Sequence, residues 1–355
     1  MKRPGPEDVT VTIVNWNGRE HLRACLEGLA ALERAPARIL VVDNASDDDS
    51  VSMVREHFPR VDVLELPENG GPCPARNAGL EAATTAWVLA LDNDAVVRPD
   101  ALERMLDAVA PNVVCVQPRA VFAEEPGRIH YDGARIHYAG IMRLWNYYRP
   151  VAEADPVPER IDAVVSFGLL LHRETALAVG AYDPIHFILF EDHDLSYRLR
   201  AAGHDIAHAP EAIVLHREGT AGISFRERGG YAARRVYLHS RNRWIVLLKC
   251  LRWRTLFLGG PGILVYEALY FGFALKEMAL GAWFRGKFAA LGLLPAILRA
   301  RRAVQRSRVR PDRELLGAGP LTVSPLIERG DLIRRLQGAA EALMNLWWRI
   351  IRPLV

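Results

Sequence analysis

Leu89-Ala-Leu-Asp-Asn-Asp-Ala95 reads as a buried strand that ends in two carboxylates, Asp92 and Asp94. Side chains at i and i+2 of a strand point to the same side. Two carboxylates that leave the carboxyl end of a strand together supply oxygen ligands for Mg²⁺ or Mn²⁺. The same tripeptide also suits a turn closed by an Asx hydrogen bond, and alone it favours neither interpretation.

This stretch is the fourth in a series of short apolar strands separated by helical patterns. Strands that alternate with helices predict an α/β fold, in which a mostly parallel sheet has helices on both faces. The expected strands are 9–14, 39–42, 61–66 and 87–91, and the expected helices between them are 19–34, 51–58 and 73–84.

Polar loops follow three of these strands, at 15–18, 43–46 and 92–94. The carboxyl ends of parallel strands meet at one edge of a sheet, which is where ligands of such sheets bind. Taken singly, Asn17 and Asn44 are ordinary turn residues. Taken together, the three loops predict one ligand site.

A second acidic group follows the apolar run 187–190. Glu191 and Asp192 come directly after that run, so partial desolvation is expected to raise the pKa of at least one and suit it to proton abstraction. Asp194 favours a simpler interpretation, a negative charge at the start of the helix that runs to Gly203.

His216 follows an expected strand at 212–215. A lone histidine after a strand is usually structural, but next to a metal site a neutral imidazole is a credible ligand. Residues 111–165 look irregular, with short strand-like pieces at 113–116 and 135–138 that could carry acceptor specificity.

The carboxyl-terminal part is basic: residues 231–355 hold 22 Lys and Arg against 7 Asp and Glu, whereas residues 1–230 hold 23 against 35. Tryptophans among its aliphatic runs favour an anionic membrane surface over nucleic acid as the partner. In the strongly apolar part at 244–298, the longest charge-free stretch is 255–266, which is shorter than the roughly 20 residues of a span. We therefore expect a membrane-lying hairpin or a pair of amphipathic helices. Packing on the rest of the chain or on a second subunit, as a homo-oligomer, is the alternative.

The four cysteines lie far apart, at 25, 73, 115 and 250, which argues against a disulfide framework or a zinc site and fits a reducing cytosol. Residues 1–8 lack the apolar core of a signal peptide. We expect a cytoplasmic protein, peripherally associated with the inner membrane.

With these elements in order, the chain resembles the family-2 glycosyltransferases of the GT-A fold, close to bacterial rhamnosyltransferase-like and galactofuranosyltransferase-like members. The resemblance covers about residues 8–250. It rests on Val11-Thr-Ile-Val-Asn-Trp-Asn17, Val41-Val-Asp-Asn-Ala-Ser46, Asn69-Gly-Gly71, Arg76-Asn-Ala-Gly-Leu80, Leu91-Asp-Asn-Asp94, Phe190-Glu-Asp-His-Asp-Leu-Ser-Tyr-Arg198, His216 and Ser240-Arg-Asn-Arg243.

The resemblance implies a role for each matching position. Asp94 and His216 would bind the metal, and Asp192, with Glu191 beside it, would be the catalytic base of an inverting transfer. The residues implied in binding the nucleotide-sugar are Asn15, Asn17, Asp43, Asn44, Asn69, Gly70, Arg76, Asp92 and Asn93. Pro72-Cys-Pro74 departs from the softer glycine-rich loop of many relatives, so donor recognition there is expected to differ.

The sequence thus predicts a GT-A catalytic domain over 1–240, with a nucleotide-sugar half (1–110) and an acceptor and base half (111–240), and a helical region over 241–355. The expected enzyme uses Mn²⁺ or Mg²⁺ to move a sugar, with dTDP-rhamnose the expected donor, to a lipid-linked or polysaccharide acceptor. A non-catalytic scaffold of the same fold and a nucleotidyltransferase are the alternatives, although the glycine- and lysine-rich loop of the latter is missing near the amino terminus.

Overall fold

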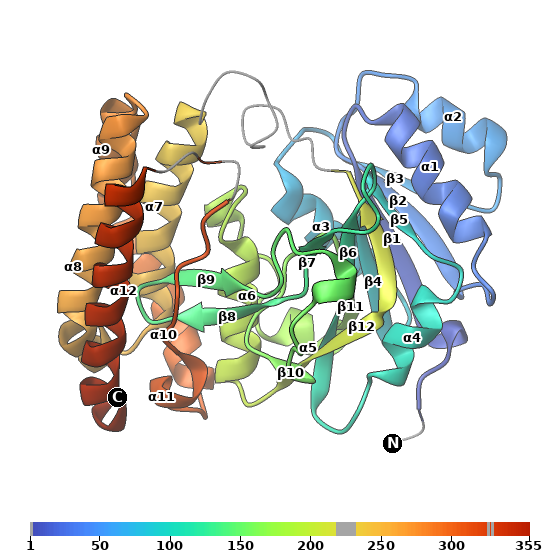
Figure 1. Ribbon diagram of the computed structural model, residues 1–355. Coiled ribbons are helices and arrows are strands. Elements are labelled where there is room, and N and C mark those ends of the chain that lie inside the picture. Colours follow the sequence, from blue (N-terminus) through green and yellow to red (C-terminus); the bar gives the residue numbers. More distant parts are fainter. Residues whose placement is uncertain (1–2, 218–231, 325–326, 328–329) are drawn as a thin grey trace. The chain divides into compact units, whose positions relative to one another are not determined.

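The computed structural model describes residues 3–217, 232–324, 327 and 330–355 and divides the chain into two compact units (Figure 1). The sheet unit comprises Met1–Ala134, Trp145–Leu199 and His204–Arg217. The helical unit comprises Arg135–Leu144, Arg200–Gly203 and Glu218–Val355. The predicted boundary between residues 240 and 241 lies inside helix α7 (Ala233–Cys250).

A ten-stranded mixed sheet forms the centre of the sheet unit, with β10-β12-β6-β11-β4-β1-β2-β3 as its main path. The pairs β1–β2, β1–β4, β2–β3 and β6–β12 are parallel, whereas β11 is antiparallel to both neighbours. Its strands are β1 (Val9–Asn15), β2 (Arg38–Asp43), β3 (Asp62–Glu65), β4 (Trp87–Asp92), β5 (Ala95–Val97), β6 (Val113–Phe122), β7 (Ile129–Tyr131), β10 (Arg160–Ile161), β11 (Gly168–His172) and β12 (Asp205–His216).

Strand register brings the predicted polar ends together. Asn15 lies opposite Asp43, and Val14, one residue earlier, lies opposite Asp92. On the other side of the site, His216 lies opposite Ala95, the residue after Asp94.

Helices cover both faces of this sheet, as expected for a doubly covered α/β sheet. Leu89 and Leu91 of β4 pack in one apolar cluster with α1 and α4, and the intervening Val88 and Ala90 pack in another with α3 and α6. The helices of the unit are α1 (Arg19–Ala30), α2 (Ser50–His57), α3 (Pro72–Ala82), α4 (Ala101–Asp107), α5 (Arg173–Ala178) and α6 (Glu191–Ala201), the last of which ends in the helical unit.

The region 111–165 is more regular than its sequence indicates. Strand β6 continues through Pro118, which lies beside the register shift between β6 and β12, where a missing backbone N–H is tolerated. The polar side chain of Gln117 inside this strand accepts a hydrogen bond from the backbone N–H of Val165 at 2.7 Å. Strand β6 is therefore maintained by tertiary contacts, although the strand propensity of its own residues predicts a break at Pro118.

Two further strands differ from expectation. The strand expected at 212–215 begins seven residues earlier and forms β12. Strand β11 was not expected at all, because five residues of apolar sequence carry no period that separates a strand from a helix.

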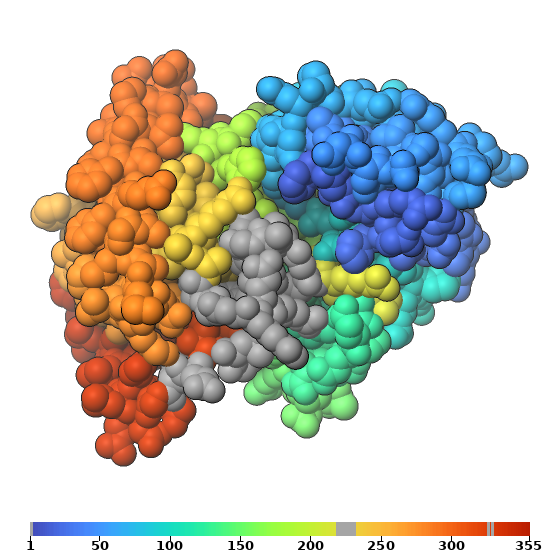
Figure 2. All heavy atoms as spheres, turned by 90° about the horizontal axis from the view of Figure 1, so that it is seen from above, coloured from blue at the N-terminus to red at the C-terminus, as the bar shows by residue number. Residues whose placement is uncertain are grey.

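The helical unit holds helices α7, α8 (Trp253–Lys276), α9 (Leu280–Gly292), α10 (Leu294–Ser307), α11 (Asp312–Leu315) and α12 (Asp331–Ile351). Figure 2 shows residues of α7 in yellow and of α8 and α9 in orange at the surface of this unit. A hairpin of β8 (Ala134–His137) and β9 (Ile141–Leu144) also belongs to it, apart from Ala134.

Tyr138, at the tip of that hairpin, explains why helix α8 has a glycine at position 262. Its ring stacks on Trp348 with centroids 4.9 Å apart, and its hydroxyl donates to the carbonyl of Met344 at 3.0 Å. A Cβ atom at Gly262 would lie only 1.9 Å from that hydroxyl. Glycine at this position therefore makes room for the tyrosine, and α8 continues through Pro261.

Candidate active site

Asn15 links two of the polar loops at the sheet edge. Its amide donates to Oδ1 of Asp43 at 3.0 Å, and its carbonyl oxygen accepts from Asn93 Nδ2 at 2.8 Å. Ser46 donates to the same Asp43 oxygen at 2.6 Å. Asn17 has a positive φ of 48°, and its side chain accepts from the backbone N–H of Asp47 at 2.9 Å, so it shapes the loop.

Asn44 holds the loop at 69–71, which is also part of the predicted donor site. Its amide donates to Oδ1 of Asn69 at 2.8 Å and to the carbonyl of Gly71 at 3.2 Å. Gly71 has a φ of 88°, and a Cβ atom there would lie 2.7 Å from the ring of Phe187. The loop therefore requires glycine at 71, while the neighbouring Gly70 would bring a Cβ atom within 3.2 Å of Pro74 only.

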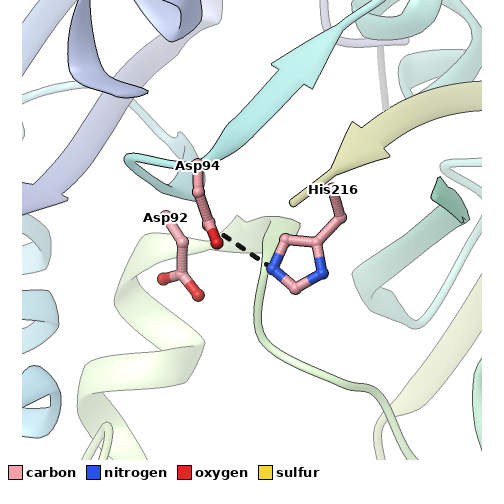
Figure 3. A group of neighbouring side chains, drawn as sticks. All are labelled: Asp92, Asp94 and His216. Carbon is pink, nitrogen blue, oxygen red and sulfur yellow. Dashed lines mark ion pairs between the residues drawn. The ribbon is translucent and has the colours of Figure 1, made fainter. Parts of the chain in front are cut away.

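Asp92, Asp94 and His216 converge, as Figure 3 shows. One ligand atom from each lies within 4.8 Å of the other two. Nε2 of His216 is 3.4 Å from Oδ1 of Asp94. The β5–β12 register delivers the histidine to the two acids, 122 residues beyond Asp94 in the sequence.

A second histidine, His130 of β7, holds the ring of His216 from the other side. The two Nδ1 atoms lie 3.0 Å apart, so one of them carries the shared proton. When His216 Nδ1 donates, its Nε2 keeps a lone pair toward the acids, which is the form that binds metals. His130 stacks on Phe122 at 4.3 Å, which fixes its plane.

Arg76 of α3 joins this group to the second acidic group. Its Nη2 donates to Asp92 Oδ1 at 2.7 Å and to the carbonyl of Ser166 at 3.0 Å, and its Nη1 lies 3.4 Å from Glu191 Oε1. Burial lowers the pKa of Arg76, but the carboxylates, Asp92 first, raise it well above the ordinary value. The guanidinium is therefore a fixed positive charge between the two acidic groups.

Glu191 and Asp192 begin helix α6 in a desolvated environment. Burial, with the charge of Asp192 second, raises the pKa of Glu191 to about 8, and burial also raises the pKa of Asp192. Among the described residues, Glu191 Oε2 and Asp192 Oδ1 are buried with no hydrogen-bond partner. Buried carboxylate oxygens without a donor are suited to receive one from a ligand.

The apolar run before these acids is a strained loop. Phe187, Leu189 and Phe190 have φ values of 63°, 67° and 73°, a region that side chains other than glycine rarely occupy. Such strain is typical of segments that position functional groups.

Asp194 lies in the first turn of α6, as predicted, and it also pairs with an arginine of the same helix. It is fully buried, and Arg198 Nε donates to its Oδ2 at 2.7 Å. The other guanidinium nitrogens of Arg198 donate to the carbonyls of Val179 and Ala181. Through Arg198, Asp194 therefore helps to fix helix α6 to the segment before it.

Four contributors escaped the sequence interpretation: His130, Ser166, Phe167 and Tyr182. Ser166 also hydrogen-bonds Tyr182 at 3.0 Å, and the carbonyl of Phe167 accepts from the backbone N–H of Asp92 at 3.0 Å. His130 lies in a three-residue strand and the other three in irregular stretches, and none belongs to a motif, so no local signal could have identified them.

The family model described as glycosyl transferase family 2 matches residues 10–167. The succinoglycan biosynthesis protein ExoO of Rhizobium meliloti is 38% identical over 101 residues, which are 28% of this chain and 29% of that protein. The pre-mycofactocin glycosyltransferase of Mycobacterium tuberculosis is 32% identical over 217 residues, 60% of this chain and 43% of that protein. The chain thus spans less than half the length of these two relatives.

Two other proteins are matched over a larger share of their own length. The N-acetylglucosaminyl-diphospho-decaprenol L-rhamnosyltransferase of M. tuberculosis is 25% identical over 232 residues, 58% of this chain and 75% of that protein. The crystal structure of GalNAc-T7 with UDP, GalNAc and Mn²⁺ superimposes with a TM-score of 0.50 and 17% identity over 68% of this chain and 49% of that one, which shows the GT-A fold. Residues 10–167 of this chain therefore form a glycosyl transferase family 2 domain.

Proposed function

We propose that this chain is an inverting, metal-dependent glycosyltransferase of bacterial cell-envelope glycan synthesis. One observation carries the proposal: Arg76 bonds both Asp92, beside Asp94 and His216, and Glu191, beside Asp192. The guanidinium of Arg76 thereby lies between a group suited to bind a metal and a group that holds a buried carboxylate suited to accept a proton. Metal-dependent, inverting transfer from a nucleotide-sugar uses both, the metal for the leaving group and the proton acceptor for the attacking hydroxyl.

The donor atoms of Asp94 and His216, with Asp92 beside them, fit a divalent cation. Carboxylate oxygens suit Mg²⁺ and Mn²⁺, and the imidazole nitrogen favours Mn²⁺ of the two. A cation held there would neutralise negative charge on a departing nucleoside diphosphate. His130 would orient His216, and Arg76 would orient Asp92, through the hydrogen bonds that they form with these side chains.

We assign the nucleotide to the loops that Asn15 and Asn44 organise. Asp43 and Asn17 would contact the base and ribose, with Asn69 and Gly70 alongside. Asp92 and Asn93 would lie toward the donor sugar, and Arg76 toward the diphosphate. The name of the rhamnosyltransferase relative supports dTDP-rhamnose as the first donor to test.

Asp192 is assigned as the base, which takes the proton of an acceptor hydroxyl on its buried Oδ1 as that hydroxyl attacks in line. Attack opposite the leaving group inverts the anomeric carbon, and no covalent intermediate is needed. Glu191, with its pKa near 8, keeps its proton at neutral pH and adds no second negative charge beside Asp192.

We further propose a lipid-linked or polysaccharide acceptor at the cytoplasmic face of the inner membrane. Support comes from the decaprenol in the name of the rhamnosyltransferase relative and from the basic composition of residues 231–355.

Calorimetric titration tests the donor site directly. The wild-type chain should bind UDP or dTDP with Mn²⁺ present and at least about tenfold more weakly with EDTA. Asp94→Ala should lose the metal-dependent part of the nucleotide binding. Glu33 is an exposed acid on the same unit, so Glu33→Ala should bind nucleotide as the wild type does. Equal binding with and without metal by the wild type refutes the proposal. A panel of nucleotide-sugars, scored for hydrolysis and transfer, then identifies the donor.

A further inference from the structure

The helical unit exposes an unusual share of large apolar side chains. Among the described residues, every exposed large hydrophobic side chain except Trp16 belongs to residues 253–354. The most exposed on helices include Phe257 at 84%, Leu332 at 70% and Phe288 at 68%. Exposed apolar side chains mark an interaction site where they gather on one surface.

Helices α8 and α12 each present these residues as one continuous stripe. On α8 the stripe, here called the α8 ridge, recurs at intervals of four and three residues: Phe257, Pro261, Leu264, Ala268, Phe271 and Leu275. On α12 the same intervals give the α12 ridge: Leu332, Leu336, Ala339, Leu343, Leu346 and Ile350. All twelve residues are exposed, and none carries a charge. This spacing keeps a stripe on one side of a helix over its whole length.

The opposite faces of both helices are already occupied within the unit. Trp347 Nε1 donates to the carbonyl of Leu258 at 2.8 Å, which joins α12 to α8. Met344 and Trp348 of α12 are buried. The ridges are therefore the outer faces of a packed pair of helices.

The one acidic side chain within α8 points inward. Glu267 receives hydrogen bonds from Arg243 Nη1 at 2.5 Å and Trp244 Nε1 at 3.0 Å, and Lys287 Nζ lies 2.5 Å away. By length and composition α8 is apolar enough to cross a membrane. Crossing would carry this ion-paired group and its partner helices into hydrocarbon, at high cost, whereas lying along the surface leaves it on the protein side.

The positive charge of residues 231–355 favours a lipid surface over a second copy of the chain as the partner of the ridges. Residues 231–355 carry 22 basic against 7 acidic side chains, so a second copy of this chain would bring like charges together. Anionic head groups are attracted by the same charges. Trp253 and Arg254 at the start of α8, and Arg349 on α12, are residue types that favour the level of the head groups.

We propose that the α8 and α12 ridges lie in the outer apolar layer of an anionic lipid leaflet, with both helices along its surface and Glu267 on the protein side. This inference rests on the proposed function only for its biological setting, since it names the surface at which a lipid-linked acceptor would be met. The surface itself follows from exposure, spacing and charge.

Vesicle co-sedimentation of the full chain tests the proposal without any requirement for turnover. Two double variants remove ridge side chains: Phe257→Ser with Leu264→Ser, and Leu336→Ser with Leu343→Ser. Val309→Ser is the control, because Val309 is 69% exposed in the same unit but lies outside both ridges. Wild type should bind phosphatidylcholine vesicles containing phosphatidylglycerol at least tenfold better than pure phosphatidylcholine. Each double variant should lose at least tenfold, and the control should change less than twofold.

Unchanged binding by both double variants would overturn the proposal, as would equal binding to the two lipid mixtures. Sedimentation velocity without lipid adds a third decisive outcome: a wild-type oligomer that the ridge variants convert to monomer assigns the ridges to a second copy instead. Thermal melting shows that the variants are folded. Nucleoside diphosphate binding, measured in parallel, reports on the proposed function separately, so either idea can fail alone.

Discussion

The candidate site has carboxylates in two different environments, Asp92 and Asp94 on one side and Glu191 on the other. The side chains of Asp92 and Asp94 are 28% and 20% exposed; Asp92 ends strand β4, and Asp94 lies in the turn after it. Glu191 is 6% exposed, begins a helix after a strained loop, and has a raised pKa. The two partly exposed acids are open to a cation and a ligand, whereas burial raises the pKa of Glu191 and Asp192 and prepares them to take up a proton. Solvation, more than residue type, would then separate the proposed metal ligands from the proposed base.

The largest effect should come from Asp192→Asn on the base side. An amide cannot take the acceptor proton, so kcat should fall by about 10³-fold, while metal-dependent donor affinity stays within about twofold. Steady-state kinetics and calorimetry measure the two quantities. Turnover near the wild-type rate would reassign the base and leave the metal side unaffected.

Arg76→Ala should damage both sides at once. Removing the guanidinium leaves Asp92 and the buried Glu191 without their partner, which should lower the free energy of unfolding by about 3 kcal/mol at pH 8. At pH 6 the loss should be smaller, since Glu191 then takes up its proton. Urea unfolding at the two pH values measures this. A loss that does not depend on pH would show that Arg76 stabilises the fold without coupling to Glu191.

The pH dependence of stability tests the burial of Glu191. Its pKa is raised from 4.5 to about 8, so between these values the folded state binds more protons than the unfolded chain. The free energy of unfolding should therefore decrease as the pH rises from about 5 to about 8. Glu191→Gln should flatten this slope and raise the melting temperature at pH 8. The same slope in variant and wild type would mean that other groups cause it.

His130→Phe gives the smallest expected effect and concerns the metal side alone. Phenylalanine keeps the stacking on Phe122 but removes the hydrogen bond to His216 Nδ1. Mn²⁺ affinity should fall by about tenfold, because the ligand ring loses its orientation. Titration of Mn²⁺ in the presence of nucleoside diphosphate checks this, and an unchanged affinity would remove His130 from the site.

Much of the sheet could be predicted because its elements are local in sequence. Strands β1, β2 and β4 are apolar runs that end in polar loops, and each can be read within a window of ten residues. β11 and most of β6 could not be predicted in this way. One is too short for a period, and the other contains Pro118 and depends on contacts with distant strands.

The sequence by itself determined the order of the strands and helices up to β4, the family of residues 10–167, and the residue types available for metal and proton chemistry. These features depend on spacing along the chain, which the sequence states directly. Only the tertiary structure decided that Arg76 bonds both Asp92 and Glu191 and that His130 faces His216. It also decided which sides of α8 and α12 remain exposed. Each of these depends on burial and on contacts between residues far apart in the chain, so no local pattern encodes them.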